Sequence, residues 1–392
     1  MGSLLLALIY LCFISLGLPD SLLGSSWPVL HTEINVPESF AGIISITIFI
    51  GTILSSLLSD RMLKKFGAGR VTAISTLMTA VALFGFSVST KFWMVLLWSV
   101  PYGLGAGGVD AILNNYVALH FKAQHMSWLH CMWGVGASIS PYIMSFSLVN
   151  LDNWSFGYLI VSIIQVIISI IVFISVPVWK KGEENSPAVS EPTTAEPLSF
   201  KEMFSTKGAI ACFITFFAYC AFELTASLWA SSYLVDVWSL EPEIAAGFAS
   251  MFYIGITVGR FANGFLAMRV GDHTLIRTGI AIIGVGVVLM FLPHHIFALV
   301  GFAIIGLGCA PIYPCIIHMT PNVFGEDKSQ AMIGVQMAFA SLGFLTMPSL
   351  FGVIAEKISI SLLPIYLAIL LVVMLINHEL VAQKKKGRKQ IE

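Results

Sequence analysis

The chain has 392 residues, of which 57% are hydrophobic and 10% are charged, and its formal net charge is -1. Soluble domains carry about 25% charged residues, and a water-soluble chain of this length cannot bury so much apolar side chain. The composition therefore excludes a soluble globular protein, and the near-zero net charge excludes a basic nucleic-acid-binding protein.

Long apolar runs predict twelve membrane-spanning helices, because a helix needs about 20 residues to cross the hydrocarbon core. The first run lacks the basic flank and small-residue cleavage site of a signal peptide, so it is expected to be a span. The expected spans are 3–30, 39–59, 70–89, 92–120, 126–149 and 154–178, followed by 208–237, 243–268, 274–292, 295–320, 329–355 and 360–381. The predicted fold is an all-α integral membrane protein with two six-helix halves.

The middle of the chain is expected to separate the two halves. Residues 179–206 are charged and rich in Pro and Ser, with no apolar period, which is typical of a linker. The predicted parts are an N-terminal half at 1–178, a cytoplasmic linker at 179–206, a C-terminal half at 207–383 and a basic cytoplasmic tail at 384–392.

Lys and Arg lie mostly on one side of this topology. Of the 20 Lys and Arg residues, all but Lys91 and Lys357 lie on one side. They fall in the loops that follow even-numbered spans, in the linker, in the tail or, for Arg260, at the inner end of the eighth span. This asymmetry places both termini in the cytoplasm. The expected location is a bacterial inner (plasma) membrane, which the chain crosses many times.

The two halves form a repeat. A shift of 203 residues brings Asp20 onto Glu223, Asp60 onto Asn263, and Asp110 onto Tyr313. Parallel halves related about the membrane normal are a transporter architecture, with the substrate site where the repeats meet. The sequence therefore predicts a transporter in which Asp20 and Glu223 face one another across a central cavity.

The loop after the second span reads G-T-I-L-S-S-L-L-S-D-R-M-L-K-K-F-G-A-G-R at residues 51–70. It resembles the signature G-x-L-a-D-r-x-G-r-k of the major facilitator superfamily. The resemblance implies that Asp60 pairs with the other half and gates transport, although an acid and an arginine at a helix end are also typical of ordinary capping. The implied gating residues are Gly51, Asp60, Arg61, Arg70 and, in the degenerate second copy, Arg260.

Four spans are similar to the fucose permease group of proton–sugar symporters. The similar runs are L-P-D-S-L-L-G-S-S-W-P (18–28), G-A-G-G-V-D-A-I-L-N-N (105–115), Y-C-A-F-E-L-T-A-S-L-W-A-S-S-Y-L (219–234) and I-Y-P-C-I-I-H (312–318). This resemblance implies alternating-access sugar transport by a monomer. Asp110 stands where the group has glutamate, and Glu223 stands where it has an amide or a small residue, so the particular sugar is not implied.

Three acids are expected inside the bilayer, where a charge costs about 2.5–3.5 kcal/mol. They are Asp20, Asp110 and Glu223, and no Lys or Arg is expected at their depth. Burial without a cation favours the protonated carboxyl, which suits a proton-coupled carrier. The repeat aligns Asp110 with Tyr313, so an acid occurs at this position in only one half. Asp110 is therefore the first candidate for the proton carrier.

Side chains that suit a sugar occur on the same spans, because carboxylates and amides bind hydroxyls and aromatic rings offer flat apolar faces. His130 is either a proton relay or a structural donor, and Trp27 and Trp238 are expected to be interfacial anchors. The candidate substrate-binding residues are Asp20, Asp110, Asn114, Asn115, His130, Trp133, Tyr219, Glu223, Trp229, Tyr233, Tyr313 and Gln336.

The leading functional hypothesis is proton symport of a small neutral polyhydroxy solute, in the first place a sugar. Sodium symport stays open because clustered carboxylates also hold cations, and so does proton-coupled efflux of a lipophilic cation. The sequence contains no metal-ligand spacing, phosphate loop or nucleophile–base pair, so we expect no metal site, no cofactor and no enzyme activity.

Overall fold

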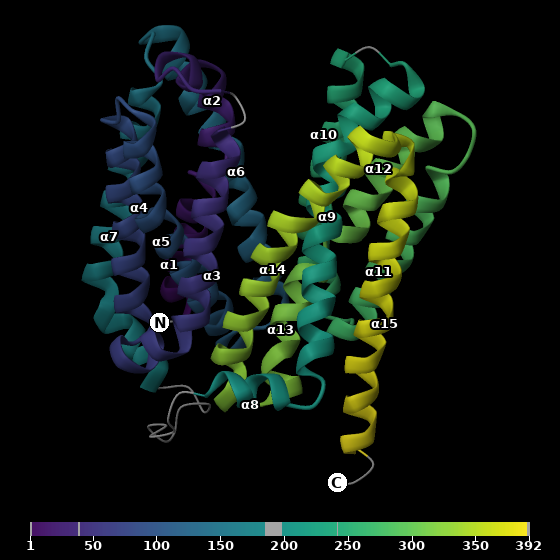
Figure 1. Cartoon of the computed structure of the whole chain (residues 1–392). Coiled ribbons are helices and arrows are strands. Elements are labelled where there is room, and N and C mark those ends of the chain that lie inside the picture. Colours follow the sequence, from purple (N-terminus) through teal and green to yellow (C-terminus); the bar gives the residue numbers. More distant parts are fainter. Residues whose placement is uncertain (1, 38–39, 185–197, 241, 390–392) are drawn as a thin grey trace. The chain divides into compact units, whose positions relative to one another are not determined.

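The computed structural model describes residues 2–37, 40–184, 198–240 and 242–389, and within these ranges it is almost entirely helical with no strand. The chain divides into two compact units (Figure 1). Unit 1 comprises residues 1–120 and 129–197, and unit 2 comprises residues 121–128 and 198–392.

Ten helical stretches in the described part of the chain are long and apolar enough to cross a membrane. The last of them, Glu326–Gln383, has 58 residues and contains two long helices. The helix α10 (Pro242–Leu266) is a further helix of 25 residues. With the last stretch counted twice and α10 added, the described helices match the twelve predicted spans, so the all-α membrane fold is confirmed.

Unit 1 is a bundle whose central helices pack tightly. Its helices are α1 (Gly2–Gly17), α2 (Leu22–Glu33), α3 (Phe40–Phe66), α4 (Ala68–Ser87), α5 (Phe92–His120), most of α6 (Ala123–Asn150) and α7 (Ser155–Glu184). The helix α4 packs against α5 and α7, and α5 also packs against α3. A Cβ atom at Gly103 of α5 would lie 2.2 Å from the carbonyl oxygen of Ile48 of α3, so this close approach requires glycine.

Unit 2 is a second helical bundle. Its helices are α8 (Phe200–Ser205), α9 (Ala209–Trp238), α10, α11 (Asp272–Leu289), α12 (His295–Cys309), α13 (Ile312–Phe324), α14 (Glu326–Ile354) and α15 (Leu363–Lys389). A π-helical turn, Ala355–Ser359, and a 3₁₀ turn, Ile360–Leu362, join α14 to α15. The helix α9 packs against α14 and α15, while α12 packs against α10 and α11.

Two predicted spans are each broken into two helices. The span predicted at 3–30 is interrupted between α1 and α2, beside Pro19, and the span predicted at 295–320 is interrupted between α12 and α13, beside Pro311. Proline lacks the backbone N–H that a continuous helix needs. Non-helical backbone at membrane depth is tolerated where protein buries it or where it lines a cavity, so the first break is a natural place for Asp20.

The predicted linker is partly helical. The helix α7 continues to Glu184, and α8 begins in a capping box in which Ser199 and Glu202 bond reciprocally. The hydrogen bonds from the Ser199 side chain and backbone lower the pKa of the exposed Glu202 carboxyl. Residues 185–197 of the linker, and the side chains of the predicted basic tail, lie outside the described residues.

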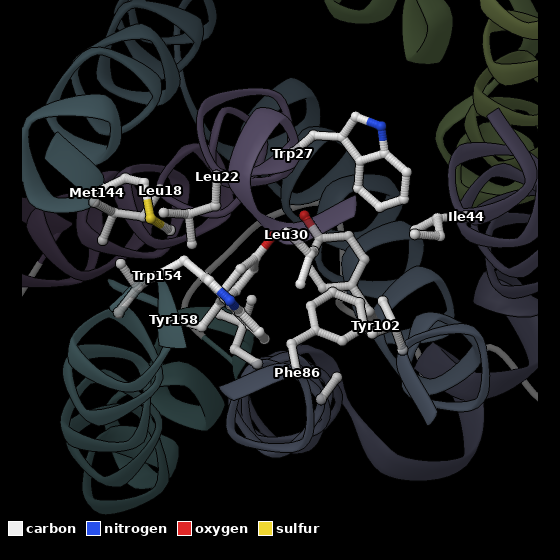
Figure 2. Close-up of a cluster of buried hydrophobic side chains, with 14 residues drawn as sticks. Leu18, Leu22, Trp27, Leu30, Ile44, Phe86, Tyr102, Met144, Trp154 and Tyr158 are labelled. Atoms are coloured by element: carbon white, nitrogen blue, oxygen red, sulfur yellow. The ribbon is translucent and has the colours of Figure 1, made fainter. Parts of the chain in front are cut away.

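A cluster of large buried side chains fills the interior of unit 1 beside α2 (Figure 2). In it the Phe86 ring stacks on Tyr102 at a centroid distance of 6.3 Å and meets Tyr158 edge-on at 5.5 Å. Trp27 belongs to the same cluster and is only 6% exposed, so it is not the outward-facing interfacial anchor that the sequence suggested. The cluster includes Tyr102, whose hydroxyl is directed to Asp20.

Candidate functional site

Asp20 lies in the break between α1 and α2, where its side chain is exposed. Tyr102 of α5 donates its hydroxyl to Asp20 Oδ1 at 3.0 Å, and Trp133 of α6 donates its indole N–H to Asp20 Oδ2 at 2.8 Å. Each carboxylate oxygen therefore receives a neutral donor, which stabilises the charged form without a cation. The helix break exposes the acid, and two neighbouring helices orient it.

Asp110 belongs to a second hydrogen-bonded group in unit 1. Asn114 donates its Nδ2 to Asp110 Oδ1 at 2.7 Å, as expected for residues four apart on one helix face. His130 Nε2 lies 3.1 Å from Asn114 Oδ1. Since an amide oxygen can only accept, the hydrogen of this bond sits on His130 Nε2. This contact favours the structural-donor interpretation of His130, because an amide separates its ring from Asp110.

Asp20 and Asp110 share an electrostatic setting. In the described part of the chain, no basic nitrogen lies within 4.0 Å of either carboxylate. Asp110 is partly exposed, whereas Asn114 and the adjacent Asn115 are buried. Unit 1 therefore presents two accessible acids held by neutral side chains. Both acids were expected to be buried, whereas Asp20 is exposed and Asp110 is partly exposed.

Glu223 has a different setting in unit 2. Its Oε1 lies 3.3 Å from Nη2 of Arg260, which comes from α10. One expectation was therefore wrong: no cation was expected near the three acids, and Arg260 supplies one to Glu223. The arginine stem is long enough to carry its charge from one helix to the next, and which helices face one another is not visible in the sequence.

The other candidates in unit 2 mostly take part in packing. Tyr219, Tyr233 and Gln336 are buried, whereas Trp229 and Tyr313 are partly exposed. The two buried tyrosines and Trp229 donate to backbone carbonyls, and Gln336 and Tyr313 bond to neighbouring side chains. In this conformation only Trp229 and Tyr313 of this set offer accessible aromatic surface to a solute.

The predicted gating residues of the first half lie in α3 and at the start of α4, whereas Arg260 of the second half lies on α10. Asp60 is buried and pairs with Lys64 one helical turn later, at 3.2 Å. Arg61 and Arg70 are exposed, and Gly51 is buried where α3 approaches α5. The basic partner seen for Asp60 is thus Lys64, and the gating role of this group stays a prediction.

Tyr102 is a site residue that the sequence analysis missed. It precedes Asp110 by eight residues on α5, a spacing that returns to nearly the same helix face. This spacing could have identified it, but an aromatic residue in an apolar run is usually part of the core.

Replacing Tyr102 by Phe is expected to slow solute transport about tenfold. The change keeps the ring in its cluster but removes one donor from Asp20, and a hydrogen bond to a charged group contributes about 1.5–3 kcal/mol. Tyr158→Phe is the matched control, because that hydroxyl lies 2.9 Å from Ser26 Oγ in the same cluster. Initial rates in reconstituted vesicles measure both variants, and equal losses would contradict a specific role for Tyr102.

Two helical bundles with apolar spans, a duplicated sequence and an acid exposed at a helix break are features of polytopic membrane transporters. The family model described as "Major Facilitator Superfamily" matches residues 9–249 and 211–390 of the chain. It therefore belongs to this superfamily, as the signature after the second span predicted.

Similar proteins extend over nearly the whole chain. Bypass of stop codon protein 6 of Saccharomyces cerevisiae is 23% identical over 96% of this chain and 82% of its own length. The glucose/mannose transporter GlcP of Bacillus subtilis is 22% identical over 88% of this chain and 86% of its own. The solved structure of the E. coli fucose:proton symporter FucP has a TM-score of 0.77 and 14% identity, covering 95% of this chain and 98% of that one.

Proposed function

We propose that this transporter moves a small neutral polyhydroxy solute, in the first place a sugar, by proton symport with alternating access. The observation that carries the proposal is the pair of acids in unit 1, Asp20 and Asp110, which are accessible and held by neutral side chains. Two similar proteins, named as a glucose/mannose transporter and a fucose:proton symporter, support the substrate class and the coupling ion.

The two acids are suited to different tasks. Both oxygens of Asp20 already accept hydrogen bonds, from Tyr102 and Trp133, so Asp20 is held as an acceptor for solute hydroxyls. Asp110 accepts from the side chain of Asn114 through Oδ1, and its second oxygen keeps the capacity to take a proton. We therefore assign proton transfer first to Asp110 and solute binding first to Asp20.

The driving force is adequate for accumulation. A proton that moves inward gains about 2.3 kcal/mol per 100 mV of membrane potential, which corresponds to roughly fifty-fold accumulation of a neutral solute. A neutral acid that carries the proton avoids most of the cost of moving a bare charge through the bilayer.

The proposal also covers the gate, the orientation in the membrane and the oligomeric state. The gate comprises Gly51, Asp60, Arg61 and Lys64 of α3 and Arg70 of α4, together with Arg260 of α10. Both termini face the cytoplasm, as the distribution of Lys and Arg indicates, and the working unit is a monomer in a bacterial inner (plasma) membrane.

Proton movement during sugar transport tests the coupling. Thermal stabilisation of the purified protein by glucose, mannose and fucose would first select the sugar that binds best. Adding that sugar outside sugar-free vesicles is expected to make the weakly buffered external medium more alkaline. Uptake that needs sodium at fixed pH would overturn proton coupling. Stabilisation by tetraphenylphosphonium and by none of the sugars would instead favour efflux of a lipophilic cation.

A further inference from the structure

Glu223 differs from Asp20 and Asp110 because it forms an ion pair, and the two partners of that pair are buried to different depths. Glu223 is on α9 and Arg260 is on α10, and both belong to unit 2. Their side chains are 16% and 7% exposed. The carboxylate is thus the more accessible partner, and the guanidinium lies deeper in the protein.

Two tyrosines lie near the deeper partner. Tyr219 precedes Glu223 by one helical turn on α9 and is fully buried, with its hydroxyl donated to the Cys309 carbonyl at 3.0 Å. Tyr219 and Tyr313 both lie near enough to Arg260 to interact with it electrostatically. A guanidinium in such surroundings has little water to stabilise its charge, so the nearby carboxylate of Glu223 contributes to stabilising it.

The pair also places a cation beside the carboxyl of Glu223. A cation within hydrogen-bonding distance favours the ionised carboxylate, whereas burial beside neutral groups favours the protonated acid. The pair uses Oε1 of Glu223, and an ionised carboxylate has two oxygens with about four acceptor positions. The second oxygen of Glu223 therefore keeps acceptor capacity while Oε1 faces the arginine.

We infer that Arg260 is a positioning residue that holds Glu223 as a permanently ionised acceptor for hydroxyl groups of the solute. The inference rests on the proposed sugar transport and removes Glu223 from the proton-coupling residues that the sequence suggested. The acids of unit 1 and the acid of unit 2 then have separate tasks. Asp110 exchanges protons during the cycle, and Glu223 binds solute without changing its charge.

Single substitutions separate binding from proton coupling. Glu223→Gln is expected to weaken binding of the best-binding sugar of the glucose, mannose and fucose panel about tenfold at every pH from 5 to 8, because a neutral amide replaces a charged acceptor. The number of protons moved per sugar, obtained from the reversal potential of sugar flux in vesicles, is expected to stay at the wild-type value. A loss of one proton per sugar in this variant would overturn the inference.

Changes at Arg260 test positioning directly. In Arg260→Gln the carboxyl of Glu223 loses its cation and is expected to take up a proton as the pH falls, so sugar binding weakens toward pH 5 relative to wild type. Arg260→Lys keeps a cation and is expected to follow the wild-type pH profile. A folded Arg260→Gln protein with a wild-type pH profile would contradict the positioning role.

The double variant Glu223→Gln/Arg260→Gln is the matched control for the pH effect. It removes both charges together, so it avoids an uncompensated buried ion, and its sugar binding is expected to lack the additional pH dependence. Persistence of that dependence would show that Arg260 acts through another group and would overturn the inference. If wild-type sugar flux moves no protons, the proposed coupling fails, while the binding measurements still decide the role of Glu223.

Discussion

Replacing Asp110 by Asn is expected to abolish uphill accumulation of the solute while exchange of solute across the membrane continues. The amide has nearly the same size and can still accept a hydrogen bond from Asn114, so the site should keep its shape. It cannot take a proton, so the step that couples solute flux to the proton gradient is lost. Since one proton at 100 mV supports roughly fifty-fold accumulation, the accumulation ratio should fall to about one.

Two assays in reconstituted vesicles separate these outcomes. Uptake of labelled sugar under an imposed proton gradient measures accumulation, and counterflow between labelled and unlabelled sugar measures exchange. Asp236→Asn is the matched control, because Asp236 is an exposed acid near the end of α9. It should accumulate sugar as the wild type does. Full accumulation by the Asp110→Asn protein would remove Asp110 from proton coupling.

The spans were predictable because the bilayer imposes both their length and their composition. The two breaks were not placed, although Pro19 and Pro311 stand beside them. Proline inside a spanning helix is tolerated when neighbouring groups satisfy the freed backbone. The sequence does not distinguish such a proline from one that separates two helices, since the difference depends on packing.

The sequence identified those site residues whose charged side chain is energetically costly inside a membrane-spanning helix. Asp20 and Asp110 were identified because a membrane acid needs a functional reason, and Asn114 followed from its spacing to Asp110. Trp133 was among the candidates, but two contacts made by other helices were missed. Tyr102 reaches Asp20 across 82 residues and Arg260 reaches Glu223 across 37, and both contacts depend on how neighbouring helices are rotated. Hydropathy and spacing along one helix contain no information about that rotation.

The helix α6 joins the two units within one continuous helix. Its first residues, up to Trp128, pack in unit 2, and its remaining residues pack in unit 1. Within unit 2, Asn263 of α10 donates its Nδ2 to Ser127 Oγ at 2.7 Å, and both side chains are buried. Asn263 is the residue that the repeat aligns with Asp60. We call this packing of the first turns of α6 against α10 the docked state, and we expect it to be part of the transport cycle.

Replacing Gly264 by Ala is therefore expected to slow sugar exchange. A Cβ atom there would lie 2.0 Å from the Trp128 indole nitrogen, so the indole must leave its position against α10. Overpacking of this kind costs about 1–3 kcal/mol, which disfavours the docked state about 5- to 150-fold relative to the undocked one. Counterflow rates measure the effect.

Two further variants identify the cause of this slowing. Gly284→Ala is the matched control, because its Cβ would meet nothing closer than a Leu371 methyl carbon at 3.7 Å, and exchange should continue at the wild-type rate. In a Trp128→Ala background the clashing ring is absent, so adding Gly264→Ala should slow exchange no further. Such non-additivity is the signature of two residues in direct contact. Fully additive effects would mean that the glycine acts elsewhere, and that docking of the first turns of α6 onto α10 does not control exchange.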